Sequence, residues 1–374
     1  MEMYSPSALF GKAHGYATRH HDSVAILSAK HGLLLPDEII SILLVCLMLI
    51  PIAHASASTH VNVGVFVYTW YNPSSPISWQ YPKIVDKPIL GFYDSSNPKV
   101  VATQIEQIEG LGIDFVMLNW LGKGTFSDEA VGTWYQVAKS RSTQLKLSIM
   151  VEPYDEEHAY NYSEIYDRAY ALFQADPIQS LTTNSKPVIF FYNGATLTGE
   201  AARTLPLDDR FDVMTVGHRA YVDFWYDDIR GNPDYVPPRI PYRDQISVLP
   251  RFDDYWQWET GLRDHVDVVD RYLTEGLYRS QWDRAMDLAS KGLVIWITIA
   301  TWNEYSERTE IEPHYDNTAY TTDPYYLYNL TKQYVAVLHA QLLPVPEFPE
   351  FPTLLMPLMV TLVLVLLIKR RQTL

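Results

Sequence analysis

The chain has 374 residues, and 47% of them are hydrophobic, which is enough for one large α/β domain or two smaller ones with a full core. It carries 29 lysines and arginines against 44 acidic residues, a net charge of -15, and its basic residues form no long cluster before the C-terminus. This composition excludes general disorder and gives no support to nucleic-acid binding.

Near the N-terminus, an apolar run over residues 39–52 is followed by Ala53-His-Ala55. Small residues at these positions predict a signal-peptide hydrophobic region and cleavage site over residues 39–55, and hence export. The preceding residues are acidic rather than basic, and residues 1–38 form a polar extension that an incorrectly assigned start codon would explain. An uncleaved N-terminal membrane anchor is the alternative.

Residues 60–343 alternate apolar strand-like runs with helix-like stretches, the pattern of successive βα units around a parallel sheet. Helices are predicted over Pro98–Leu111 and Gln281–Lys291 from apolar residues at helical spacing. Eight strands are predicted: Val63–Thr69, Ile113–Asn119, Leu145–Glu152, Pro187–Tyr192, Phe211–Gly217, Val222–Tyr226, Ile246–Pro250 and Leu293–Ala300. Eight such strands without a break predict a single (β/α)8 TIM barrel, with no room for a conventional helix between the fifth and the sixth.

A proline-rich linker is predicted over residues 344–352, followed by a transmembrane anchor and basic tail over residues 353–374. Lys369-Arg-Arg371 at the end of the apolar stretch predicts a cytoplasmic C-terminus and a barrel outside the cell membrane. The Pro-Glu-Phe segment with its apolar helix and basic tail resembles archaeal C-terminal surface-sorting segments. A buried C-terminal helix of the domain is the alternative.

The segment Thr301–Pro313 follows the last predicted strand and contains four glutamates. Catalytic residues of α/β barrels gather at the carboxyl ends of the strands, so Glu304 and Glu307 are expected at the functional rim. Two neighbouring carboxyls repel, and one of them is expected to keep its proton while the other ionises, as glycosidases require. A solvated acidic loop is the alternative.

Several other predicted strands also end in polar or aromatic residues, among them Tyr71, Trp120, Glu152 and Tyr226. Their shared placement predicts one site at the barrel rim. Glu152 alone is equally compatible with a buried structural acid. Aromatic side chains in these loops are suited to stacking on sugars, although most must belong to the core.

In order, these segments resemble glycoside hydrolase family 99, the endo-α-1,2-mannosidases. The matching segments are Tyr68-Thr-Trp-Tyr-Asn-Pro73, Leu90–Ser95 with the chain to Trp120, Val151-Glu-Pro-Tyr154, Lys186–Tyr192 and Trp302–Pro313. The last is the most specific, because the family has Asn-Glu-Trp-His-Glu-Gly-Thr where this chain has Asn303-Glu-Tyr-Ser-Glu-Arg-Thr309.

The resemblance implies net retention through a sugar 1,2-epoxide, with Glu304 as the base that deprotonates the sugar 2-hydroxyl and Glu307 as the acid that protonates the leaving oxygen. It also implies sugar binding by Glu152, Trp120, Tyr71, Tyr226 and Asn303. No cofactor and no metal is expected. The expected partner is an oligosaccharide or polysaccharide substrate, cleaved at α-mannosides.

The chain departs from the family pattern at Tyr305, Ser306 and Arg308. Arg308 is next to Glu307 and is expected to pair with it, which would favour the ionised form and weaken a general acid. The alternative function is therefore a carbohydrate-binding barrel without catalysis, and a third is a barrel associated with glycosyl transfer.

Overall fold

A computed structural model of the chain describes residues 60–75, 78–79, 83–152, 161–192, 205–217, 223–225, 244–318 and 321–341. The predicted leader over 39–55, the linker over 344–352, the anchor over 353–374 and Tyr226 lie outside these ranges. No helix within them combines the length and apolarity needed to cross a membrane.

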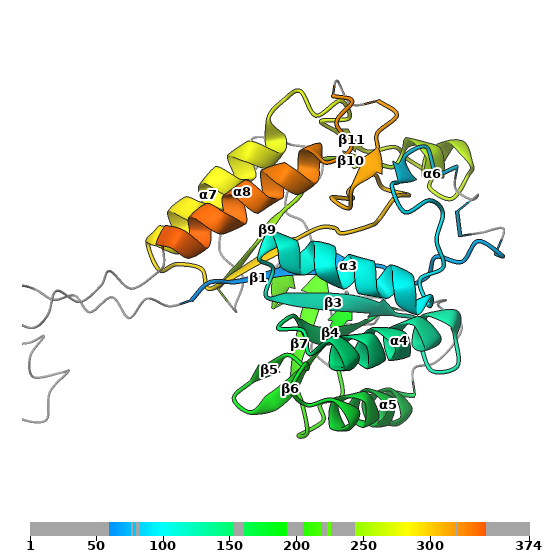
Figure 1. Ribbon diagram of the computed structural model, residues 1–374, viewed down its shortest axis with the longest axis vertical. Coiled ribbons are helices and arrows are strands. Elements are labelled where there is room, and N and C mark those ends of the chain that lie inside the picture. The colour runs from blue at the N-terminus through cyan, green and yellow to red at the C-terminus, as the bar shows by residue number, and fades with distance from the viewer. Residues whose placement is uncertain are drawn as a thin grey trace, which may run out of the picture. The chain divides into compact units, whose positions relative to one another are not determined.

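The protein is a mixed α/β structure built on a parallel sheet (Figure 1). Its parallel strands are β1 (Asn62–Val67), β3 (Phe115–Trp120), β4 (Lys146–Val151), β6 (Lys186–Tyr192), β7 (Asp212–Gly217), β8 (Phe224–Trp225), β9 (Gln245–Val248) and β12 (Trp296–Ile299). The hydrogen-bonded order is β8-β7-β6-β4-β3-β1-β12-β9, with β5 (Thr182–Thr183) antiparallel to β6. All eight predicted strands are thus present in one sheet. Among the described residues, no hydrogen-bonded pairing joins β8 to β9, although these two end strands contact each other.

Six helices and two small ribbons are described around the sheet. The helices are α3 (Pro98–Leu111), α4 (Phe126–Arg141), α5 (Tyr162–Ala175), α6 (Tyr255–Glu259), α7 (Leu277–Ser290) and α8 (Tyr326–Gln341). The antiparallel ribbons are β2 (Lys87–Pro88) with β13 (His314–Tyr315), and β10 (Phe252–Asp253) with β11 (Val268–Val269). Helices α7 and α8 lie side by side, and α3 packs against both α4 and α8 (Figure 1).

Helix α3 has the predicted bounds because local chemistry fixes both of its ends. The Asn97 side chain accepts a hydrogen bond from the Lys99 backbone at 2.9 Å, and Pro98 occupies the first helical position. Gly112 ends the helix with a φ of 81°, a left-handed conformation that glycine adopts without strain. Helix α7, predicted from Gln281, begins four residues earlier at Leu277, because Leu277 and Tyr278 are also buried in the core.

The sheet is buried on both faces. Alternate residues such as Val65 and Leu118 pack with helix residues in one cluster, whereas Phe66, Phe115 and Met117 belong to a second cluster made mainly of strand side chains. Gly64 lies where a Cβ atom would come within 2.2 Å of the Phe115 ring. The face of the sheet that carries Phe66, Phe115 and Met117 is therefore packed with large side chains, so a functional site is expected at the ends of the strands.

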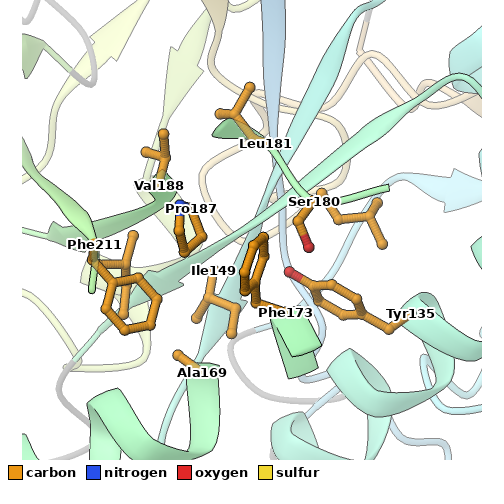
Figure 2. A pocket seen from close by; sticks show the side chains of 11 residues that line it. Tyr135, Ile149, Ala169, Phe173, Ser180, Leu181, Pro187, Val188 and Phe211 are labelled. Carbon is orange, nitrogen blue, oxygen red and sulfur yellow. The ribbon is translucent and has the colours of Figure 1, made fainter. Parts of the chain in front are cut away.

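A small pocket lies between the sheet and its helices, lined by residues such as Ile149 of β4, Val188 of β6 and Ala169 of α5 (Figure 2). Its volume of about 10 Å³ is the space of about one water molecule. This pocket is a packing defect of the core and is too small for a sugar.

Candidate functional site

The segment after β12 forms a tight turn that fixes Glu304. The Glu304 backbone N–H donates to the Thr301 hydroxyl at 2.8 Å, and the Thr309 N–H donates to the Glu304 carbonyl at 3.2 Å. The Glu304 carboxyl accepts hydrogen bonds from the Ser306 N–H at 3.1 Å and from the Ser306 hydroxyl. Glu304 is only 2% exposed, so it is a buried acid rather than a member of a solvated loop.

Glu152 lies at the carboxyl end of β4 and accepts a hydrogen bond from the Asn119 side chain, near the end of β3. Burial, together with the charge of Glu307, raises the pKa of Glu152 to about 8. Burial also raises the pKa of Glu304 well above its ordinary value, and the charges of Glu307 and Glu152 add to this effect. Three carboxyls from two parts of the chain, the end of β4 and the segment after β12, are therefore close enough to affect one another.

Glu307 forms an ion pair with Arg263, in the segment between α6 and β11. Arg263 also lies 3.1 Å from Asp254 and donates to the Gln257 side chain at 2.5 Å. Gln257 in turn donates to the Ser306 hydroxyl at 2.8 Å. The α6 region thus holds both catalytic candidates, Glu307 through a guanidinium and Glu304 through Ser306.

The expected pairing of Arg308 with Glu307 is wrong. Arg308 has a φ of 56°, and its guanidinium is buried among Asp86, Asp253 and Asp316, at 2.7, 3.0 and 3.2 Å. Burial of these acids requires such a partner, because an unpaired buried charge is costly. Arg308 therefore anchors the segment through these three ion pairs. The arginine that pairs with Glu307 is Arg263, 44 residues earlier in the chain.

Asn303 is fully buried and joins the turn that carries Glu304 to the end of β1. Its side-chain oxygen accepts from the Tyr68 N–H at 2.7 Å, and its amide donates to the Tyr68 carbonyl and the Tyr93 hydroxyl, each at 2.9 Å. The Tyr71 hydroxyl donates to the Asn303 carbonyl at 2.7 Å. Asn303 and Tyr71 thus bind the protein's own backbone and position the turn that carries Glu304.

Trp120 is fully buried on the helix-facing side of β3, where its indole N–H donates to Asp128 at 3.0 Å. The adjacent Asn119 faces the other side and contacts Glu152. Because side chains alternate between the two faces along a strand, Asn119 rather than Trp120 is the residue of this pair that faces Glu152. Nothing in the sequence linked Arg263 or Gln257 to Glu307, since their proximity depends on the long segment around α6.

An aromatic cluster underlies the segment, formed by Tyr68, Tyr71, Trp79, Tyr93 and Tyr305. The rings of Tyr71 and Trp79 are stacked, with centroids 4.0 Å apart. The hydroxyls of Tyr93 and Tyr305 both donate to Glu312, each at 2.9 Å. These aromatic residues are therefore largely structural, and they make the turn rigid.

Asp86, His314 and Asp316 have the mutual spacing of a metal-binding group. Arg251 and Arg308 already contact Asp86 and Asp316, which places two guanidinium groups against these carboxylates. Two fixed positive charges oppose a cation, so this group is better described as a buried ion-pair network.

No protein-family model and no curated protein sequence matches the chain. Among solved structures, it is similar to the GH99 endo-α-mannosidase from Bacteroides thetaiotaomicron in complex with bis-tris-propane, with a TM-score of 0.55 and 18% identity over 75% of this chain and 98% of that one. A second structure of that enzyme matches with a TM-score of 0.54 and 16% identity, over 75% and 98% of the two chains. At this identity the likeness establishes a shared fold.

Proposed function

We propose that the protein is a retaining glycoside hydrolase resembling the endo-α-1,2-mannosidases, which cleaves α-mannoside-type glycans. The observation that carries the proposal is the convergence of Glu304, Glu307 and Glu152 at the carboxyl ends of the parallel strands. The similarity in fold to an endo-α-mannosidase supports it.

In the proposed reaction, Glu304 takes the proton of the sugar 2-hydroxyl, and the freed oxygen attacks the anomeric carbon. The bond to the leaving oxygen breaks while Glu307 protonates that oxygen, which leaves a 1,2-epoxide. Water then opens the epoxide, with Glu307 accepting a proton from the water and Glu304 returning one to the 2-oxygen. Retaining enzymes with a protein nucleophile need carboxyls about 5–5.5 Å apart across the bond. Two acids on one turn suit neighbouring-group attack better.

Two features of the free protein oppose these roles. Burial favours the neutral form of Glu304, while the Arg263 ion pair favours the ionised form of Glu307. Cleavage therefore requires Glu307 to leave Arg263 and gain a proton, and Glu304 to lose one.

The same ion pair favours a second candidate function, a carbohydrate-binding barrel that does not cleave its ligand. A glutamate held by a guanidinium is a poor proton donor. In that case, Glu152 and Glu304 would bind sugar hydroxyls without reacting.

We also propose that β8 and β9 close the sheet into an eight-stranded barrel, because the strand order follows the chain and its two end strands contact each other. We further propose a cell-surface location, with the barrel outside and residues 353–374 as a single membrane anchor. This location is supported by the sequence alone.

The test is turnover by the full-length protein, purified in detergent, on two substrates: an α-mannosyl-containing glycan and an α-mannosyl fluoride carrying one extra sugar. Fluoride leaves with little need for protonation. Glu304→Gln should therefore lose activity on both substrates by about 10²-fold or more, whereas Glu307→Gln should lose far more activity on the glycan than on the fluoride, for which Glu307 serves only in the opening of the epoxide by water. NMR of the first product should show retention of the α-anomer.

The matched control is Glu259→Gln, which removes an exposed glutamate at the end of α6 and should leave both rates unchanged. If Glu307→Gln loses the fluoride activity and Glu304→Gln keeps it, the two roles are exchanged. Sugar binding without turnover of either substrate would favour the carbohydrate-binding function over the hydrolase function.

A further inference from the structure

His60, Asp114 and His339 meet at the amino end of the sheet, the end opposite to the three glutamates. Asp114 directly precedes β3, His60 precedes β1, and His339 lies in the last turn of α8. One donor atom from each lies within 4.8 Å of the others. Because the three residues are far apart in sequence, no metal-binding motif with a fixed spacing predicts this cluster.

The distances between these donor atoms fit a shared metal ion. The His60 Nε2 is 3.1 Å from one Asp114 oxygen, and the His339 Nε2 is 3.6 Å from the other. A tetrahedral Zn²⁺ with nitrogen and oxygen ligands at about 2.0–2.2 Å sets its ligand atoms about 3.3 Å apart. The two imidazole rings lie together, with centroids 5.3 Å apart and planes tilted by 32°.

The His339 Nε2 is buried and lies 3.6 Å from Asp114, which is within ion-pair distance but longer than a good hydrogen bond. Without an ion the two groups form a long ion pair, whereas a metal ion placed between them would contact both directly. The Val61 backbone lies close to the ring of His339, and neighbours of this kind orient a metal-binding histidine. Asp114 is oriented in the same way, because its Oδ2 accepts from the Val63 N–H at 2.7 Å.

We propose that His60, Asp114 and His339 form a structural site for a zinc-class divalent ion, with water as the fourth ligand. The ion ties the residue that enters β1 to the end of α8, and so joins the first and last described segments of the barrel to β3. Two imidazoles and one carboxylate favour zinc or a neighbouring transition metal over Mg²⁺ and Ca²⁺, which prefer oxygen ligands. Among the residues that the structure describes, Asp114 and the two histidines have no guanidinium partner, unlike the Asp86 group.

The test is calorimetric titration of Zn²⁺ and of Mg²⁺ into the full-length protein, prepared in detergent without a histidine tag and first treated with a chelator. We expect one Zn²⁺ per chain and no comparable binding of Mg²⁺. Zinc at about a hundredfold excess over its Kd should raise the midpoint of thermal unfolding by roughly 5 °C or more.

His60→Ala and His339→Ala should each weaken Zn²⁺ binding at least tenfold and abolish the thermal shift. The His60 side chain is 59% exposed, so His60→Ala should fold even if His339→Ala does not. The matched control is His265→Ala, since this exposed histidine also lies beside two aspartates, at 2.6 and 3.4 Å. Equal Zn²⁺ binding by wild type and His60→Ala, or no binding by the wild type, would overturn the proposal.

Discussion

Replacing Glu312 by glutamine should remove a specific part of the pH dependence of stability. Glu312 is 1% exposed and accepts hydrogen bonds from the Tyr93 and Tyr305 hydroxyls on one oxygen, and from the Gln104 amide on the other at 3.1 Å. A glutamine fits this space: its oxygen can accept both tyrosine hydroxyls, and Gln104 can rotate its amide to accept the new N–H. The substitution removes the charge and leaves the packing intact.

Burial raises the pKa of Glu312 from its ordinary 4.5 to about 7, against the opposing effect of these hydrogen bonds. Below pH 4.5 the folded and unfolded chains both hold this proton, and Glu312 adds no pH dependence to the stability there. Between 4.5 and about 7 only the folded chain holds it, so the free energy of unfolding falls as the pH rises, and it levels off above 7. At 1.36 kcal/mol per pKa unit, the loss is about 3 kcal/mol.

The assay is thermal unfolding of wild type and Glu312→Gln between about pH 5 and pH 8. We expect similar midpoints at the acid end and a variant more stable by roughly 6–12 °C at the alkaline end, from about 2–4 °C per kcal/mol. Glu310, whose burial raises its pKa to about 8, titrates in both proteins and cancels in the comparison. A difference between the two proteins that does not change with pH would refute the reasoning, as would a variant that loses the same stability as the wild type.

Three further predictions concern the support of the site. Asn303→Leu should destabilise the fold by at least about 3 kcal/mol in urea unfolding, because the buried Tyr68 N–H and C=O lose their partner, and an unchanged midpoint would contradict this. Arg263→Gln should increase glycan turnover relative to fluoride turnover if Glu307 is the acid, and a fall in both rates would make Glu307 the base. Gly64→Ala should cost about 1–3 kcal/mol by thermal unfolding, since its Cβ would overlap the buried ring of Phe115, and a neutral effect would mean that this ring can move.

The strands were predictable because each is an apolar run that is buried on both faces, and α3 because Asn97, Pro98 and Gly112 mark its ends. The turn that carries Glu304 was predictable from its position after a strand. The partner of Glu307 was not predictable. Arg308 is adjacent to Glu307 in the sequence, but its positive φ directs its side chain elsewhere, and Arg263 pairs with Glu307 instead. A positive φ at a non-glycine residue leaves no signal in a single sequence.

Each of the three residues that differ from the family pattern has hydrogen-bond or ion-pair partners within this chain. Tyr305 donates to the buried Glu312 at 2.9 Å, and Ser306 contacts both Glu304 and Gln257. Arg308 forms ion pairs with three acids, Asp86, Asp253 and Asp316.

The substituted residues hold the turn rigid and keep Glu304 buried. The substitutions therefore do not themselves favour the loss of catalysis. The choice between cleavage and binding depends instead on whether a bound sugar can separate Glu307 from Arg263, which the comparison of glycan and fluoride turnover measures directly.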